Sequence, residues 1–160
     1  MILGGTRDSR LLVYITALIA LVLSLLPVPQ LLSILWPNLL VLVVLYWSTM
    51  APLAGGMLLG FLAGLTLDVL GGGQLGQHAF ALSLLTYLAL KLHLLTRSKP
   101  LFEQSMFVFI ALLLYEATLW AIDGFGGHGT GNWMRWLHVP VDALLWPVVV
   151  GVLGRLHSPR

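Results

Sequence analysis

The sequence predicts an all-α integral membrane protein, built as a bundle of six transmembrane helices in one domain that takes up residues 1–160. Of these 160 residues, 59% are hydrophobic and 9% are charged, whereas an ordinary soluble domain carries about 25% charged residues. The hydrophobic residues form runs close to the roughly 20 residues that cross a bilayer. Because these runs fill nearly the whole chain, no separate soluble domain is expected.

The six hydrophobic runs follow one another with short breaks. The expected spans are residues 11–26, 31–47, 53–70, 75–95, 101–122 and 137–156. The breaks contain residues that favour turns, among them Pro27 and Pro29, the glycines 71–73 and the glycine-rich segment 123–131. The first span is short, and prolines crowd its boundary with the second. Five complete spans with a re-entrant hairpin at that boundary are therefore the alternative.

The basic residues indicate the orientation, because lysine and arginine are enriched in cytoplasmic loops. With six spans, Arg135 falls on one side of the membrane. Seven basic residues fall on the side of both termini: Arg7, Arg10, Lys91, Arg97, Lys99, Arg155 and Arg160. The sequence therefore predicts a multi-pass protein with cytoplasmic N- and C-termini.

Tryptophans support the expected boundaries. Four of them fall near the ends of spans: Trp47, Trp120, Trp133 and Trp136. Amphipathic rings of this kind favour the headgroup level of the membrane. We therefore expect these side chains at the membrane surface, with no catalytic role.

The third span carries glycines at a regular spacing of four residues, at Gly56, Gly60 and Gly64, and the same spacing leads to Asp68. Residues four apart lie along one face of a helix, and small residues there let two helix backbones approach closely. Two interpretations follow. The ridge packs against another helix of this chain, or it forms a docking groove for a helix of another protein.

Ionisable residues within spans are costly and are therefore candidates for function. The six-span topology places Asp68, Glu116 and Asp142 in the outer half of the bundle, and His78 opens the fourth span from the same side, directly after Gln77. We expect these five side chains to converge as an outer polar cluster. They either cap or hydrogen-bond neighbouring helix ends, or they line a water-filled outer cavity.

The residue inventory excludes several classes of function. The chain has no cysteine, which excludes disulfides and thiolate chemistry. The five histidines form no i, i+4 pair of the kind that binds zinc, and no Gly-x-Ser-x-Gly elbow occurs. A formal charge of +2 does not suggest nucleic-acid binding. We expect no catalytic residues, metal or cofactor, and no enzymatic activity.

Several motifs together resemble the rod shape-determining protein MreD family, over essentially the whole chain. The most specific block is Gly60-Phe-Leu-Ala-Gly64-Leu-Thr-Leu-Asp68-Val-Leu-Gly71, followed by Leu75-Gly76-Gln77-His78-Ala79. Trp36-Pro37-Asn38 before an apolar run, Tyr87-Leu-Ala-Leu-Lys91-Leu-His93 and the late Leu145-Trp146-Pro147 also fit.

The resemblance implies a non-enzymatic scaffold in the bacterial inner membrane that maintains rod cell shape during side-wall peptidoglycan synthesis. It implies MreC, a bitopic membrane protein, as a binding partner, and joint work with MreB, RodA and the transpeptidase partner of RodA. A homodimer is also compatible with it. The implied fold is similar to that of the S components of energy-coupling-factor transporters. This likeness gives the alternative, a small-ligand-binding membrane subunit of a transporter, and an intramembrane enzyme is the third hypothesis.

Overall fold

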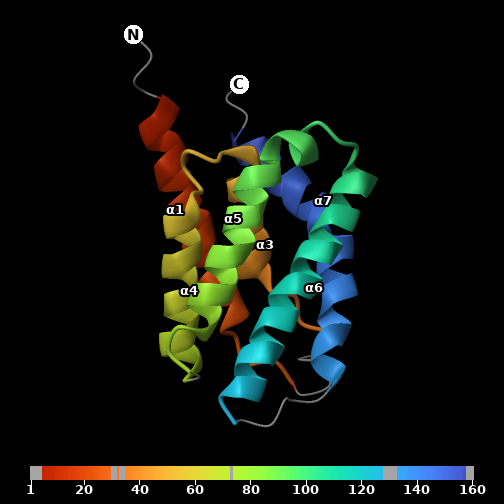
Figure 1. Cartoon of the computed structure of the whole chain (residues 1–160). Helices are drawn as coiled ribbons and strands as arrows, with labels where there is room; N and C mark the ends of the chain where they lie inside the picture. Colours follow the sequence, from red (N-terminus) through yellow and green to blue (C-terminus); the bar gives the residue numbers. More distant parts are fainter. Residues whose placement is uncertain (1–4, 30–31, 33–34, 73, 128–132, 158–160) are drawn as a thin grey trace.

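The structure, a computed structural model, describes residues 5–29, 32, 35–72, 74–127 and 133–157. Every regular element in these ranges is helical: α1 (Gly5–Ser24), α3 (Leu39–Met50), α4 (Met57–Gly71), α5 (Gln77–Arg97), α6 (Leu101–Phe125), the 3-10 helix η1 (Trp133–Leu137) and α7 (His138–His157). The helices run side by side along one axis (Figure 1). The expected all-α architecture is confirmed.

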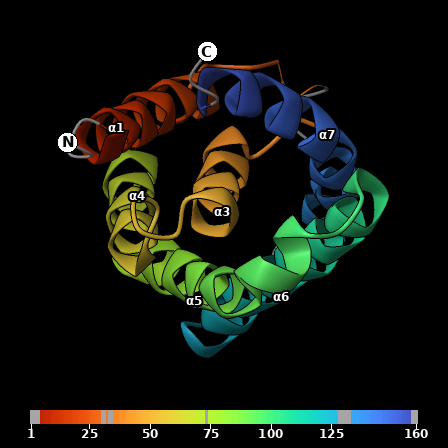
Figure 2. The same ribbon diagram turned by 90° about the horizontal axis from the view of Figure 1, so that it is seen from above.

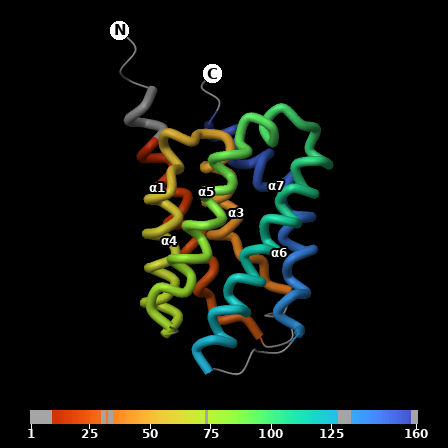
Figure 3. The backbone as a smooth tube through the Cα atoms, in the orientation of Figure 1, coloured from red at the N-terminus to blue at the C-terminus, as the bar shows by residue number. Residues whose placement is uncertain are grey.

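The two ends of the bundle differ in what they contain. The first turn of α1 and the last turn of α7 lie at the same end, which we call the terminal end (Figures 1 and 3). The connection from α3 to α4 crosses this end. At the opposite end, which we call the polar end, α4 and α6 finish and α5 and α7 begin.

Helix α3 forms the centre of the bundle. Seen along the axis, α1, α4, α5, α6 and α7 surround it (Figure 2), and it contacts α1, α4, α5 and α7. Every residue from Leu40 to Thr49 is buried. A helix that is hydrophobic on all sides has no face for water and belongs in such a place. Burial of these side chains away from both lipid and water makes α3 the core of the fold.

The second expected span starts later than the hydrophobic run suggests. Helix α3 begins at Leu39, and residues 36–38 are not helical. Pro37 explains the difference, because it has no N–H to donate to a helix and disfavours the helical conformation at Trp36. Residues 30, 31, 33 and 34 of the expected span lie outside the described residues.

The helices differ in their capacity to cross a bilayer. Three described stretches are long and apolar enough for a complete crossing: Gln77–Arg97, Leu101–Phe125 and Trp133–His157. The apolar helices Arg10–Ser24, Leu39–Met50 and Met57–Gly71 are shorter. With 12 residues, α3 is about 18 Å long at 1.5 Å per residue, less than the roughly 30 Å of the hydrocarbon layer. A membrane protein is supported, and six complete spans stay a prediction.

Trp47 corrects the expectation that it lies in the headgroup layer. Its side chain is fully buried, and its indole nitrogen Nε1 donates to Oγ1 of Thr16 on α1 at 2.9 Å. The ring also meets Tyr46 edge-on, with centroids 5.2 Å apart. Trp47 thus joins the central helix to the surrounding ones. Trp120 and Trp133, in contrast, are exposed.

Candidate functional site

Asp68 lies in the last turns of α4 and caps the first turn of α5. Its Oδ1 accepts the backbone N–H of His78 at 2.9 Å, and its Oδ2 accepts those of Gly76 at 2.9 Å and Ala79 at 3.1 Å. The Nδ1 atom of His78 lies 2.9 Å from Oδ1. The first N–H groups of a helix have no partner within the helix, and a carboxylate there also suits the helix dipole.

Two glycines make this cap possible. Gly72 follows α4 with φ of +66°, and Gly76 precedes α5 with φ of +97°. Side chains other than hydrogen rarely tolerate this left-handed backbone. The tight turn between them brings the N-terminus of α5 back to the carboxylate on α4. Gly72 and Gly76 therefore have a conformational function between the two helices.

The glycine ridge before Asp68 faces α5. A Cβ atom on Gly60 would lie 2.6 Å from Cγ2 of Thr86, and one on Gly64 would overlap the backbone of His78 and Ala79. At these two positions the ridge therefore lies against α5 of the same chain. Gly56 lies outside this close contact, since the nearest atom to its Cβ would be 3.7 Å away.

Glu116 and Gln77 belong to a second group at the same end, centred on Arg135 of η1. Arg135 Nε donates to Oε2 of Glu116 at 3.1 Å, and its Nη1 donates to Oδ2 of Asp123 at 2.7 Å. Nε2 of Gln77 donates to Oδ1 of Asp123 at 2.6 Å. The Glu116 side chain is only 4% exposed. One guanidinium thus compensates the charge of two carboxylates and joins η1 to α6. The bond of Gln77 to Asp123 connects α5 to the same group.

The same group continues to the start of the central helix. His138 Nε2 lies 3.2 Å from Oε1 of Glu116 and 2.9 Å from Nδ2 of Asn38. The backbone N–H of Asn38 donates to Oδ1 of Asp142 at 3.0 Å. Asn38 is the residue directly before α3. Asp142, which belongs to α7, therefore accepts a backbone N–H at the start of α3. Asp68 of α4 accepts backbone N–H groups at the start of α5 in the same way.

The five side chains of the expected polar cluster all lie at the polar end, in two groups. Asp68 pairs with His78, while Gln77, Glu116 and Asp142 are connected through other residues. Those connecting residues are Asn38, Asp123, Arg135 and His138. These four residues were not predicted to belong to the cluster, although the sequence gives a signal for Arg135, which is the one basic residue on the outer side of the expected topology.

The chemistry available to this cluster is mainly structural. The carboxylates accept backbone N–H groups or pair with a guanidinium, and each contact joins two elements. Two buried atoms of the described cluster, Oδ2 of Asp142 and Nδ1 of His138, have no hydrogen-bond partner. In the described ranges, no three histidine or acidic side chains are grouped as metal ligands would be.

Comparison with known proteins gives two matches. A model of the rod shape-determining protein MreD family matches residues 7–155. A rod shape-determining protein MreD from Haemophilus influenzae is 34% identical over 139 residues, which are 87% of this chain and 86% of the relative. Both matches agree with the resemblance carried by the block from Gly60 to Ala79. No solved structure matches, and the likeness to transporter S components stays a prediction.

Proposed function

This chain belongs to the rod shape-determining protein MreD family, and from that premise we propose that it is a non-enzymatic scaffold of the cell-elongation machinery. In this proposal it binds MreC and helps to couple MreB filaments to side-wall peptidoglycan synthesis by RodA and its transpeptidase partner. It crosses the bacterial inner membrane six times, with both termini in the cytoplasm. The family membership supports a role in rod shape, and the partners are the part that requires testing.

The observation that carries the scaffold proposal is that the carboxylates of the polar end bond to helix ends and to a guanidinium of the same chain. Catalysis or ion coupling needs a charged group that is free to meet a substrate or a proton. Here Asp68 accepts three backbone N–H groups, and Glu116 is paired with Arg135. These groups hold helix ends in fixed positions. An end surface held in this way is preorganised, which lowers the cost of binding a partner.

The same contacts weaken the alternative, a ligand-binding subunit of a transporter. That function would use Asp68, His78, Glu116 and Asp142 as walls of a pocket. Each of them is instead bonded to another part of the chain. Co-purification with an ATPase module, or a vitamin-sized ligand in native mass spectrometry, would favour the alternative.

Two apolar grooves on the outside of the described bundle are candidate seats for the membrane helix of MreC. The groove between α6 and α7 has a volume of about 660 Å³ and is lined by Met106, Phe109 and Leu144 among others. The groove between α1 and α4 has about 170 Å³ and is lined by Leu18 and Leu62 among others. We place the partner helix in the larger groove, because it offers more surface for packing.

The first experiment depletes the protein in its rod-shaped host. We expect the cells to become round, and expression of the wild-type chain should restore rods. Unchanged rod shape in a host with no second copy would contradict the proposal.

The second experiment maps the partner by photocrosslinking in living cells. A photoreactive residue at Met106 should capture MreC, and the same residue at Leu18 serves as the matched control, since both positions are exposed on the bundle surface. Capture from Leu18 alone would move the partner to the other groove. Capture of MreC from neither groove, together with failure of MreC to co-purify, would contradict the scaffold proposal.

A further inference from the structure

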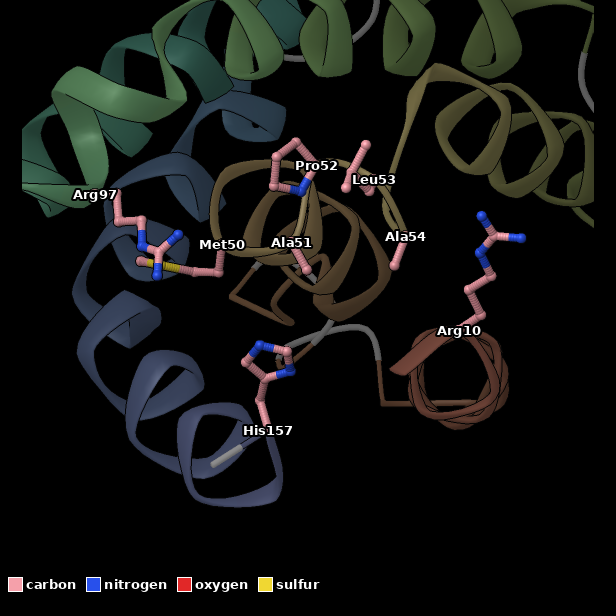
Figure 4. Close-up of a pocket in the computed structure, with 8 residues that line it drawn as sticks. All are labelled: Arg10, Met50, Ala51, Pro52, Leu53, Ala54, Arg97 and His157. Carbon is pink, nitrogen blue, oxygen red and sulfur yellow. The ribbon is translucent and has the colours of Figure 1, made fainter. Parts of the chain in front are cut away.

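A cavity of about 450 Å³ lies at the terminal end of the bundle. Its floor is the end of α3 and the chain that follows, residues 50–54, and its sides are the ends of α1, α5 and α7 (Figure 4). The volume is within the range of about 300–1,000 Å³ that is typical of small-molecule sites. The cavity lies at the opposite end from the polar cluster, and the proposed function does not use it.

Three basic side chains from three different helices surround the cavity. Arg10 comes from the start of the apolar part of α1, Arg97 ends α5 and His157 ends α7. Figure 4 shows the two guanidinium groups on opposite sides, with the imidazole ring between them. No acidic side chain is among the described residues that line the cavity. Its walls therefore carry positive charge toward a shared space.

The described acidic side chains are bound elsewhere. Glu103 pairs with Lys99 at 2.9 Å. The others take part in the contacts of the polar end: Asp68, Asp123, Glu116 and Asp142. None of these five compensates Arg10 or Arg97. Among the described side chains, none therefore competes with an outside anion for the charge-assisted hydrogen bonds of the two guanidiniums, which are the strong ones for phosphate groups.

The surroundings of the cavity indicate which class of anion it would bind. The end of α5, which forms one side of the cavity, carries exposed large apolar side chains, with Leu94 at 73% and Leu95 at 64% of their surface. In a membrane protein such side chains face acyl chains, and charged groups at the helix ends lie at the headgroup level. The cavity is thus located where apolar helix sides meet charged helix ends, the place of lipid phosphates.

One wall of the cavity is held rigidly. The imidazole ring of His157 stands edge-on to Trp47, with centroids 5.4 Å apart and planes at 82°. Trp47 is itself fully buried and bonded to Thr16. The cavity therefore rests on the central helix, and its shape does not depend on exposed side chains alone.

From these observations we propose that the cavity between Arg10, Arg97 and His157 binds the phosphate headgroup of an anionic phospholipid. The guanidiniums donate hydrogen bonds to the phosphate from two sides, and the glycerol contacts the apolar floor at residues 50–54. Basic pockets between transmembrane helices are known to serve this purpose. The competing explanation is that the same side chains only complement the negative ends of α3, α5 and α7, without any ligand.

The test measures lipid binding to the purified full-length protein by native mass spectrometry in a neutral detergent. Phosphatidylglycerol should bind in preference to phosphatidylcholine. We expect Arg10→Gln and Arg97→Gln each to weaken phosphatidylglycerol binding roughly fivefold, the effect of about one basic side chain near a lipid phosphate. Arg155→Gln is the matched control, because Arg155 is exposed in the last turn of α7 but does not line the cavity. An equal loss of phosphatidylglycerol binding in Arg155→Gln would show that only the general surface charge matters and would overturn the proposal.

A second variant and a second anion complete the test. Leu53→Glu places a carboxylate beside the guanidiniums, and because Leu53 is 92% exposed, folding should be unaffected. This variant should bind phosphatidylglycerol as poorly as the arginine variants, with an unchanged thermal midpoint in the absence of lipid. Normal lipid binding by Leu53→Glu would overturn the proposal. Inorganic phosphate should not displace the lipid at equal concentration, and equal competition would show that the ligand is a free anion rather than a lipid.

Discussion

Asp68 and His78 are joined twice, since Oδ1 of Asp68 lies 2.9 Å from both the backbone nitrogen and the ring Nδ1 of His78. One carboxylate oxygen thus fixes both the start of α5 and the orientation of its first imidazole. The other oxygen receives the N–H groups of Gly76 and Ala79. Four contacts converge on a side chain that is 2% exposed, and they close the α4–α5 hairpin at its polar end.

Asp68→Asn should destabilise the protein. An asparagine side chain keeps one acceptor oxygen and presents an NH2 group to N–H donors, so at least one buried donor loses its partner. Leaving a buried group unsatisfied costs about 1–3 kcal/mol. We expect a lower thermal midpoint in detergent and a lower steady-state level in the membrane.

The matched control for Asp68→Asn is Glu103→Gln. Glu103 is about half exposed and forms an i, i+4 pair with Lys99, a type of contact worth about 0–1 kcal/mol. The thermal midpoint of Glu103→Gln should stay near that of the wild type. Equal midpoints for the two variants would show that Asp68 does not close the hairpin.

Gly64→Ala should be more damaging than Gly60→Ala. At Gly64 the added methyl group meets the backbone of His78 and Ala79, whereas at Gly60 its two nearest atoms belong to the Thr86 side chain. Overpacking costs about 1–3 kcal/mol, and backbone cannot move aside as a side chain can. Thermal unfolding in detergent should rank wild type above Gly60→Ala, and Gly60→Ala above Gly64→Ala.

A rescue variant distinguishes the two contacts. Thr86→Ala removes both side-chain atoms nearest to residue 60 and should restore part of the stability of Gly60→Ala but none of that of Gly64→Ala. Gly151→Ala is the control, because a Cβ there has no atom within 4 Å and alanine favours a helix over glycine. Failure of Thr86→Ala to separate the two variants would disprove this packing.

The helical architecture could be predicted from the sequence because hydrophobic runs are a direct physical signal. The run that lies in the centre could not be predicted, although α3 lacks a polar face, because lipid-exposed helices are apolar on all sides as well. Trp47 illustrates the difficulty. Its position near a span end fits the headgroup layer, and only the three-dimensional packing reveals the bond to Thr16.

The polar end was anticipated in its location and less well in its membership. Depth along a span can be counted from the sequence, which placed Asp68, Glu116 and Asp142 on one side. Arg135 and His138 follow the glycine-rich segment 123–131 in the sequence. The conformation of such a segment is poorly encoded in local sequence, so the pairing of Arg135 with Glu116 could not be derived.

Arg135→Met should be destabilising because it removes the guanidinium that pairs with both Glu116 and Asp123. Removing one partner of a fully buried ion pair costs about 3–5 kcal/mol, and the expected loss here is smaller because the Arg135 side chain is 25% exposed. The second change Glu116→Gln in the same chain should recover part of the loss, which a double-mutant cycle of thermal midpoints measures. Lys99→Met is the control, since its pair with Glu103 is exposed. Strictly additive effects of the two changes at 135 and 116 would contradict a coupled pair.

Single-cysteine variants should reveal the orientation, because the natural chain has no cysteine that would need removal. Phe125→Cys lies at the polar end and Leu53→Cys at the terminal end, where the side chains are 95% and 92% exposed. In cells with a permeable outer envelope, a membrane-impermeant maleimide should label position 125 and spare position 53.

Arg10→Cys extends this labelling to the number of spans. Six spans require position 10 to behave like position 53, with labelling only after the inner membrane is broken. A re-entrant hairpin in place of one span would put positions 10 and 53 on opposite sides. Leu18→Cys, on a lipid-facing part of α1, should resist the reagent throughout and controls for its leakage into the bilayer. Labelling at position 53 and protection at position 125 while the inner membrane is still closed would mean that the bundle is inverted, with its polar end in the cytoplasm.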